Sequence, residues 1–211
     1  MNSLGKLITL EGGEGVGKST QAKLLAQKLS DLGKNVKFTR EPGGERIGEE
    51  IRQILKNSQN LDPSCEALLL FAGRRDHFIK LISPWINQGY FVICDRFYDS
   101  SLVYQGILKG VPLDDIMQLK QIAIGDFEPD FTILLDASIE VSMERIATRK
   151  VVGDEYDYMN QREHKLIRNA YHKIADIFSH RYVIINAEQS EKAVFAKLWK
   201  VFEKRMLTEG D

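Results

Sequence analysis

Short apolar runs alternate with segments of helical periodicity along most of this chain. Five of the runs are rich in β-branched and aromatic residues, which is typical of buried strands. They cover Leu7–Leu10, Val36–Arg40, Phe91–Cys94, Phe131–Leu135 and Tyr182–Ile185. Strands that alternate with helices indicate a parallel sheet with helices on both faces. The pattern therefore predicts an α/β protein of three layers, α/β/α, around a five-stranded parallel sheet.

Between the runs, apolar residues recur at the three- and four-residue spacing of amphipathic helices. The first such segment begins at Lys18 and runs through Leu25 and Leu29, and Gly33 is placed to end it. The other predicted helices cover Ile47–Leu55, Pro63–Phe78, Leu113–Gly125, Ile139–Arg149, His164–Phe178 and Phe195–Phe202. No repeat or linker interrupts the alternation, so we expect one domain over residues 1–211, with a mobile loop at about 149–157.

Composition argues against several classes of protein. Of the 211 residues, 43% are hydrophobic and 28% are charged, which is ordinary for a globular domain. With a net charge of −1, the chain lacks the broad positive surface that binders of nucleic acids or membrane surfaces need. No apolar stretch reaches the roughly 20 residues that span a bilayer. The residues before Leu7 leave no room for a signal peptide. Cys65 and Cys94 lack the spacing of a metal site. We expect a soluble, cytoplasmic protein with no nucleic-acid or membrane partner.

Residues 12–19 read GGEGVGKS, which is a complete G-x-x-x-x-G-K-[ST] phosphate-binding loop. Its glycines let the backbone turn its N–H groups towards phosphate oxygens, while Lys18 can reach the β- and γ-phosphates and Ser19 can offer its hydroxyl to Mg²⁺. A strand before the loop and a helix after it are the context that this motif requires. The residues expected to bind ATP here are Gly12, Gly13, Glu14, Gly15, Val16, Gly17, Lys18, Ser19 and Thr20.

Charged residues follow the carboxyl ends of the predicted strands, where open α/β sheets bind their ligands. They are Glu11, Arg40, Glu41, Asp95, Arg96 and Asp136. Asp95 closes an apolar strand, the usual place for the carboxylate that orders Mg²⁺ in P-loop enzymes; a strand-end cap is the less favoured alternative. Asp136 has the same position, but a helix N-cap before Ile139 explains it at least as well.

Arginines are spread over several elements that border this predicted site, at positions 52, 75, 96, 145 and 149. Each alone is ordinary surface charge, but together they suit phosphate binding, because arginine binds phosphate through two hydrogen bonds and stays charged. A guanine-reading Asn-Lys-x-Asp segment is absent, which argues against a switch GTPase. The histidines at 77, 164, 172 and 180 are interpreted as ordinary helix or surface residues, away from the strand ends. A nucleotide phosphate with a second pKa of about 6 needs no histidine as a base.

Four segments in the same order resemble bacterial thymidylate kinases. They are residues 11–19 (EGGEGVGKS), 39–44 (TREPGG), 69–77 (LLFAGRRDH) and 95–106 (DRFYDSSLVYQG). The resemblance runs from about Leu7 to the last predicted strand. It implies the P-loop nucleoside monophosphate kinase fold, Mg²⁺-dependent phosphoryl transfer from ATP to dTMP in the pathway to dTTP, and a homodimer. A kinase for another nucleoside monophosphate and a P-loop switch or partner-binding module are the alternatives.

The resemblance also implies how dTMP is bound. Phe71 would stack on thymine and Arg75 would hydrogen-bond the base, and their i, i+4 spacing places both on one helix face. The spacing alone favours Phe71 as a core residue. By the same resemblance, Arg52 and Arg96 would bind the acceptor phosphate, and Ser101 and Gln105 would contact the base. Tyr104 would lie against the sugar 2′ position and Glu14 near its 3′-hydroxyl. Glu41 would also bind dTMP, and Glu11 would add polar support.

The source of the catalytic charge also follows from the resemblance. Gly15 stands where the eukaryotic type carries an arginine, so the charge should come from the loop at about 149–157, acting as a lid. Arg149 is the expected residue, with Lys150 in reserve, and Arg145 would lie against adenine. Glu155 stands where many relatives have a basic residue. The expected catalytic residues are Lys18, Arg96 and Arg149, and the expected Mg²⁺ residues are Ser19 and Asp95.

Overall fold

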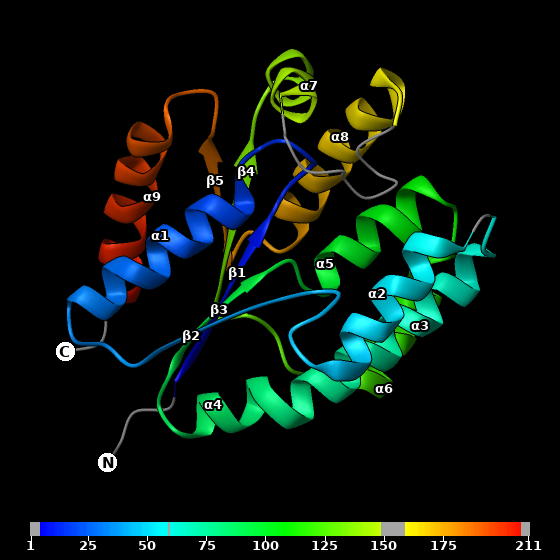
Figure 1. The fold of residues 1–211 in the computed structure, drawn as a ribbon, viewed down its shortest axis with the longest axis horizontal. Helices are drawn as coiled ribbons and strands as arrows, with labels where there is room; N and C mark the ends of the chain where they lie inside the picture. The colour runs from blue at the N-terminus through cyan, green and yellow to red at the C-terminus, as the bar shows by residue number, and fades with distance from the viewer. Residues whose placement is uncertain (1–4, 59, 149–158, 208–211) are drawn as a thin grey trace.

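A five-stranded parallel sheet with helices on both faces forms the centre of the computed structural model, which describes residues 5–58, 60–148 and 159–207 (Figure 1). The strands lie in the order β2-β3-β1-β4-β5. Their bounds are β1 Lys6–Glu11, β2 Val36–Arg40, β3 Phe91–Asp95, β4 Phe131–Asp136 and β5 Tyr182–Asn186. Each predicted run is a strand, so the predicted α/β class and the five-stranded parallel sheet are confirmed.

Helices occupy the segments in which helical periodicity was found, with local signals at several of their ends. Asp62 caps α3 by accepting from two backbone N–H groups, and Asn160 with Glu163 forms a capping box at the start of α8. The described helices are α1 Lys18–Asp31, α2 Arg46–Asn57, α3 Pro63–His77, α4 Ser83–Asn87, α5 Tyr98–Ser101, α6 Leu113–Ile124, α7 Ile139–Ala147, α8 Gln161–Ile177 and α9 Glu191–Met206.

Two π-helical segments were not predicted from the sequence. They are η1 (Phe78–Ile82), which follows α3, and η2 (Leu102–Leu108), which follows α5. The short helices α4 and α5 were missed with them. In η2 the wider turn still buries most of its side chains, and this segment forms one wall of the cavity described below. Its position therefore matters for the site.

The two faces of the sheet are covered by two separate apolar cores. Successive residues of β1 alternate between them: Leu7 lies in the core shared with α3 and α8, and Ile8 lies in the core shared with α1 and α9. In Figure 1, α1 and α9 cover one face, and α3 and α6 lie on the other side of the sheet. No helix in the described ranges is long and apolar enough to cross a membrane.

Parallel register brings the charged strand ends to one edge of the sheet. Asp95 pairs with Leu10 of β1 and with Arg40 of β2, while Asp136 pairs with Asn186 of β5. The chain order reverses at β1, which lies between β3 and β4. Such a reversal opens a crevice at the carboxyl edge, and the predicted site residues on the strand ends meet there.

Candidate active site

A cavity of about 420 Å³ opens at the carboxyl edge of the sheet. The phosphate-binding loop and the start of α1 form one wall, and residues of α2, α3 and η2 form the wall opposite. The lining is highly charged, with basic side chains at Lys18, Arg40, Arg52, Lys56, Arg74 and Arg96 and carboxylates at Glu14, Glu41 and Asp95. A site of this size and charge fits an anionic ligand of nucleotide dimensions.

The phosphate-binding loop has the backbone that its glycines predicted. Gly12, Gly15 and Gly17 have φ values of +138°, +77° and +96°, which only glycine adopts readily. At Gly15 the packing is also tight, because an added Cβ would lie 2.3 Å from the carbonyl oxygen of Ser142 on α7. No side chain fits at position 15, where the eukaryotic type would carry arginine. Val16 turns its side chain into the core, so it can meet a ligand only through its backbone.

Lys18 lies over the loop that precedes it. Its Nζ donates to the carbonyl oxygen of Gly13 at 2.6 Å, and the residue is only 7% exposed. Burial, followed by the charge of Arg96, lowers the pKa of Lys18 to about 8, although Glu14 and Asp95 oppose the shift. Bound phosphates would favour the charged form, since an opposite charge nearby raises the pKa of an amine.

Ser19 and Asp95, the two residues predicted to hold Mg²⁺, are in direct contact. The Ser19 hydroxyl donates to Asp95 Oδ2, and Asp95 Oδ1 is buried without a hydrogen-bond partner among the described residues. A buried carboxylate oxygen without a donor suits a cation or a water bound to one, so the pair fits Mg²⁺. The described residues contain no group of three or more His, Cys, Asp or Glu side chains that could hold a metal, so phosphate oxygens would complete the ligand set.

Arg96 occupies the turn directly after β3. Its φ of +71° is unusual for a residue with a side chain, and such backbone is held by its surroundings. The guanidinium donates to Tyr171 Oη at 3.0 Å and to Tyr104 Oη at 3.2 Å, and it forms an ion pair with Glu14. Burial alone would lower the pKa of Arg96, but Glu14 and its neighbours raise it well above its ordinary value. Three predicted residues, Glu14, Arg96 and Tyr104, therefore form one cluster.

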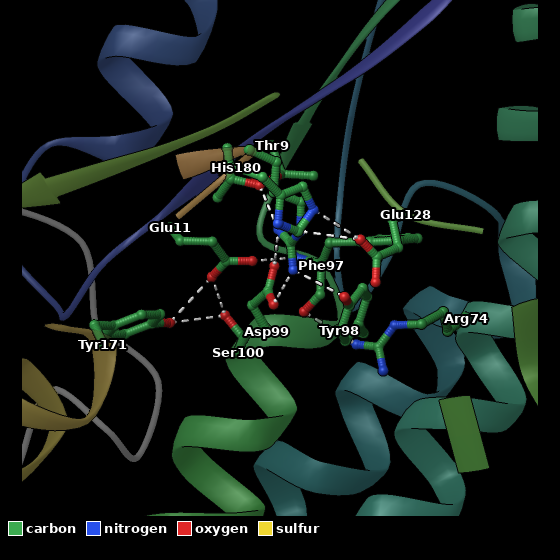
Figure 2. A network of polar contacts seen from close by, with 12 residues as sticks. Thr9, Glu11, Arg74, Phe97, Tyr98, Asp99, Ser100, Glu128, Tyr171 and His180 are labelled. Atoms are coloured by element: carbon green, nitrogen blue, oxygen red, sulfur yellow. Dashed lines mark hydrogen bonds and ion pairs between the residues drawn. The ribbon is translucent and has the colours of Figure 1, made fainter. Parts of the chain in front are cut away.

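Glu11 holds this turn from inside the protein. Figure 2 shows Ser100 and Tyr171 converging on its carboxylate. Oε1 accepts from the backbone N–H of Phe97 at 2.7 Å, and Oε2 accepts from Ser100 at 2.7 Å and Tyr171 at 3.1 Å. Burial, then the charge of Asp99, raises the pKa of Glu11 to about 7. The carboxylate fixes the segment on which Arg96 stands.

On α3, the structure corrects the predicted base-binding residues. Phe71 is 3% exposed and lies in the apolar core, whereas Arg75 is exposed and donates to the carbonyl oxygen of Ala123 at 3.0 Å. Leu70 and Arg74 line the cavity instead. The predicted spacing is right, but the pair that faces the cavity stands one residue earlier, about 100° around the helix.

Arg74 and Glu41 form a buried ion pair beneath the cavity. Arg74 Nε donates to Glu41 Oε2 at 2.7 Å, and its Nη1 donates to Ser101 Oγ at 3.2 Å. Glu41 also meets Nδ1 of His77 at 3.0 Å, and Nε2 of His77 lies 2.7 Å from the hydroxyl of Thr39. Burial alone would raise the pKa of Glu41, but Arg74 and His77 outweigh it and lower the pKa. His77 is thus a buried helix residue next to the end of β2, contrary to the expectation that the histidines lie away from the strand ends.

Other predicted acceptor residues also reach the cavity. Arg52 of α2 donates to the carbonyl oxygen of Pro42 at 3.3 Å and lines the cavity, as do Ser101, Tyr104 and Gln105 from α5 and η2. The hydroxyl of Tyr104 donates to Glu14 at 3.1 Å. The structure therefore brings the predicted acceptor set together, except for Phe71 and Arg75.

The predicted donor residues are placed less completely. Arg145 of α7 donates to the backbone oxygens of Ala187 at 2.9 Å and Gln189 at 3.3 Å and does not line the cavity. Arg149, Lys150 and the predicted lid at 149–157 lie outside the described residues.

Asp136 forms an ion pair instead of the helix N-cap that was weighed for it. Asp136 does not cap α7, which begins after Ser138; its carboxylate accepts two hydrogen bonds from Arg168, each 2.7 Å long. His172 lies 3.2 Å from the same carboxylate. The ion pair joins the end of β4 to α8, so His172, like His77, lies near a strand end, contrary to prediction.

Sequence reasoning missed several residues at or beside the cavity, among them Glu66, Leu70, Arg74 and Lys56. The first three follow one another at i, i+4 and i+8, so the signal for a shared face was present. Nothing in the periodicity said that this face, rather than the one bearing Phe71, turns to the cavity.

The fold and this cavity define a P-loop nucleoside monophosphate kinase. The cavity combines a phosphate-binding loop, a Ser–Asp pair that fits Mg²⁺, and a second set of arginines on the opposite wall. The thymidylate kinase family model matches residues 10–198. The chain therefore belongs to the thymidylate kinase family.

Relatives and a solved structure agree with this assignment. The chain is 40% identical over 208 residues to a thymidylate kinase from Bradyrhizobium sp. (strain BTAi1), covering 97% of this chain and 92% of the relative. It is 42% identical over 195 residues to one from Geobacillus sp. (strain WCH70), covering 91% and 93%. The crystal structure of thymidylate kinase from Ehrlichia chaffeensis aligns with a TM-score of 0.78 and 33% identity, over 94% of this chain and 98% of that one.

Proposed function

We propose that the cavity at the sheet edge is where this chain carries out the reaction of its family, the transfer of the γ-phosphoryl group of ATP to dTMP. A dTMP phosphate oxygen forms a bond to the γ-phosphorus as the bond to ADP breaks, giving dTDP and ADP. The observation that carries the proposal is that Lys18 of the phosphate-binding loop shares one cavity with Arg52 and Arg96. The product would enter the pathway to dTTP.

Catalysis at this site rests on charge and position. Lys18 and the N–H groups of the loop would bind the β- and γ-phosphates, and Arg96 would lie between donor and acceptor phosphates. The acceptor phosphate is already ionised near pH 7, so no general base is required. Arg149, with Lys150 as the alternative, would bring a further positive charge, and Arg145 would lie against adenine; these roles rest on the family resemblance.

Ser19 and Asp95 would hold Mg²⁺ together with the ATP phosphates. When bound, the ion neutralises charge on the phosphate oxygens during transfer. The buried Oδ1 of Asp95 supports this assignment, because it lacks a partner among the described residues.

For the acceptor base, Leu70 and Arg74 take the places expected of Phe71 and Arg75. Leu70 offers an apolar surface to one face of thymine, and Arg74 offers N–H donors to its carbonyl oxygens. Ser101 and Gln105 would contact the base, while Tyr104 and Glu14 would lie near the sugar; each of these lines the same cavity.

The remaining expectations concern the whole chain. We treat residues 1–211 as one kinase domain with a lid at 149–157, acting in the cytoplasm as a homodimer. Leu68 of α3 and Ile122 of α6, two helices that pack together, are 57% and 75% exposed, and these exposed apolar side chains support the homodimer. Light scattering on the purified protein would measure its mass.

The deciding experiment is ADP formation by the purified protein with ATP and Mg²⁺, compared across dTMP, dUMP, the ribose analogue TMP, dCMP and dGMP. We expect strong dependence on dTMP and weaker turnover of dUMP, since a methyl group is worth only about 1–3 kcal/mol. Preference for another monophosphate would support kinase activity but overturn the residues assigned to the thymine base. ADP formation that ignores every acceptor would favour a P-loop switch.

A further inference from the structure

Glu66 is a buried carboxylate that the proposed reaction does not use. It stands in the first turn of α3, and its side chain is 4% exposed. Oε1 accepts from Gln105 Nε2 at 2.7 Å, and Oε2 forms an ion pair with Nζ of Lys109 at 2.5 Å. Both partners come from η2 and the residue after it. Burying a carboxylate costs several kcal/mol unless it is paired, so this arrangement calls for an explanation.

The chemistry of Glu66 determines which way the Gln105 amide faces. An ionised carboxylate only accepts hydrogen bonds, so Gln105 must turn its NH₂ group towards Glu66. The ammonium of Lys109 contacts the other oxygen of the same carboxylate, so both Glu66 oxygens face donors. The amide oxygen of Gln105 is therefore the atom on the opposite side of the amide, and Gln105 lines the cavity.

Arg74 supplies the complementary half of the pattern. Glu66, Leu70 and Arg74 stand at i, i+4 and i+8 on α3 and so share one face of that helix. A guanidinium only donates, whereas the Gln105 oxygen only accepts. Thymine and uracil match such a pair, because O4 accepts and N3–H donates. Cytosine has the reverse arrangement, with a donating 4-amino group and an accepting N3.

We infer that Glu66 is a specificity-determining positioning residue: by fixing the Gln105 amide, it makes the cavity select pyrimidine nucleotides that donate from N3. Glu66 acts through Gln105 and does not itself touch the substrate. The inference rests on the proposed function, because it takes a pyrimidine monophosphate as the phosphoryl acceptor.

The test is the Glu66→Gln variant, assayed by ADP release with dTMP, dUMP and dCMP. A neutral amide at position 66 can accept as well as donate, so Gln105 can turn over. We expect the ratio of kcat/KM for dTMP to that for dCMP to fall by about tenfold or more. The dTMP to dUMP ratio should stay unchanged, since both bases present the same edge. A merely structural role would lower all three activities alike.

Two further variants isolate the effect. Asp76→Asn, elsewhere on α3, breaks an ion pair with Lys80 of η1 and should change neither ratio. In a Gln105→Met background, Glu66→Gln should have no further effect on the dTMP to dCMP ratio. A selectivity change that persists in that background, or an unchanged ratio in Glu66→Gln itself, would overturn the inference.

The outcomes separate this inference from the proposed function. Loss of dTMP dependence in the unmodified protein would overturn both. A dTMP-dependent protein whose Glu66→Gln variant keeps its selectivity would overturn only the role of Glu66. If the variant does not fold, a crystal structure of the unmodified protein with dTMP decides. N3 should then lie within hydrogen-bond distance of Gln105 Oε1, and a distance beyond 3.5 Å would contradict the inference.

Discussion

Arg74 and Arg75 are neighbours in the chain but have entirely different surroundings. Arg74 is buried in an ion pair with Glu41 and reaches the cavity, whereas Arg75 lies on the surface and bonds to α6. The two residues therefore form a matched pair of sites for substitution, with the same side chain on the same helix.

We expect Arg74→Lys to raise the KM for dTMP about tenfold or more, and Arg75→Lys to leave it within about twofold. Lysine keeps the charge near Glu41 but loses the planar fork of donors that spans Glu41, Ser101 and the base. Steady-state kinetics with dTMP varied at saturating ATP would measure both. A larger effect at position 75 than at position 74 would restore the base site predicted from the sequence.

The mismatch on α3 shows what periodicity can and cannot predict. It predicts which residues share a face, and both Glu66–Leu70–Arg74 and Phe71–Arg75 do. It does not predict which face meets the ligand, because that depends on η2, a π-helical segment with no sequence signal that we recognised. His77 was misjudged for a related reason, since its partners Thr39 and Glu41 come from an element far away in the chain.

The lowered pKa of Lys18 predicts a pH dependence of ATP binding. With a pKa of about 8 in the free protein, the ammonium loses its proton as the pH rises through 8. Affinity for a non-hydrolysable ATP analogue should then fall, by up to about tenfold per pH unit. The same shift makes the buried charge unfavourable for folding below pH 8, a cost that is relieved as the pH rises towards 10.5.

Calorimetric titration of the analogue between pH 6 and 10 would measure this fall. A Lys18→Arg variant binds more weakly, but its affinity should not decline over the same range, because arginine stays charged. Affinity of the unmodified protein that is constant up to pH 10 would contradict the expected titration of Lys18.

At the scale of elements, the position of α7 depends on a glycine that belongs to another segment. The carbonyl oxygen of Ser142 lies where a Cβ of residue 15 would stand, so the backbone of α7 rests directly on the phosphate-binding loop. Strand positions were predictable from apolar runs and charged ends, but such backbone-to-backbone packing between distant segments leaves no pattern in the sequence.

Gly15→Ala should therefore weaken ATP binding, whereas Gly33→Ala should not. Both residues have similar backbone, with φ of +77° and +73°, so each substitution carries a similar strain of about 1–2 kcal/mol. Only Gly15 also meets an atom, while Gly33 has open space around it. We expect at least a tenfold loss of ATP affinity for Gly15→Ala, measured by calorimetry. Equal ATP affinities of the two variants would mean that α7 shifts at little cost to make room for the added methyl group.

At the scale of the whole molecule, one buried ion pair joins the sheet to the segment that carries the site. Arg181, before β5, donates to both carboxylate oxygens of Asp99 at 2.9 and 2.7 Å and to the hydroxyl of Thr132 on β4 at 2.6 Å. Asp99 belongs to α5, which leads into η2. The geometry of the cavity wall therefore depends on contacts made deep in the core.

Arg181→Met should lower the free energy of unfolding by about 3–5 kcal/mol, because it leaves the carboxylate of Asp99 buried and unpaired. Urea denaturation followed by circular dichroism would measure the change. Arg46→Met is the matched control: it breaks an exposed i, i+4 pair with Glu50 and should cost less than about 1 kcal/mol. A decrease in the free energy of unfolding as small as that of the control would mean that water or a rearranged side chain replaces Arg181 as the partner of Asp99.

The closed space at Gly15 also limits how this enzyme could change over evolutionary time. An arginine at that position is reachable by a single base change from any glycine codon, yet in this fold it would collide with α7. An arginine in the phosphate-binding loop would therefore require α7 to shift as well. More than one substitution therefore separates this sequence from one that carries an arginine at position 15.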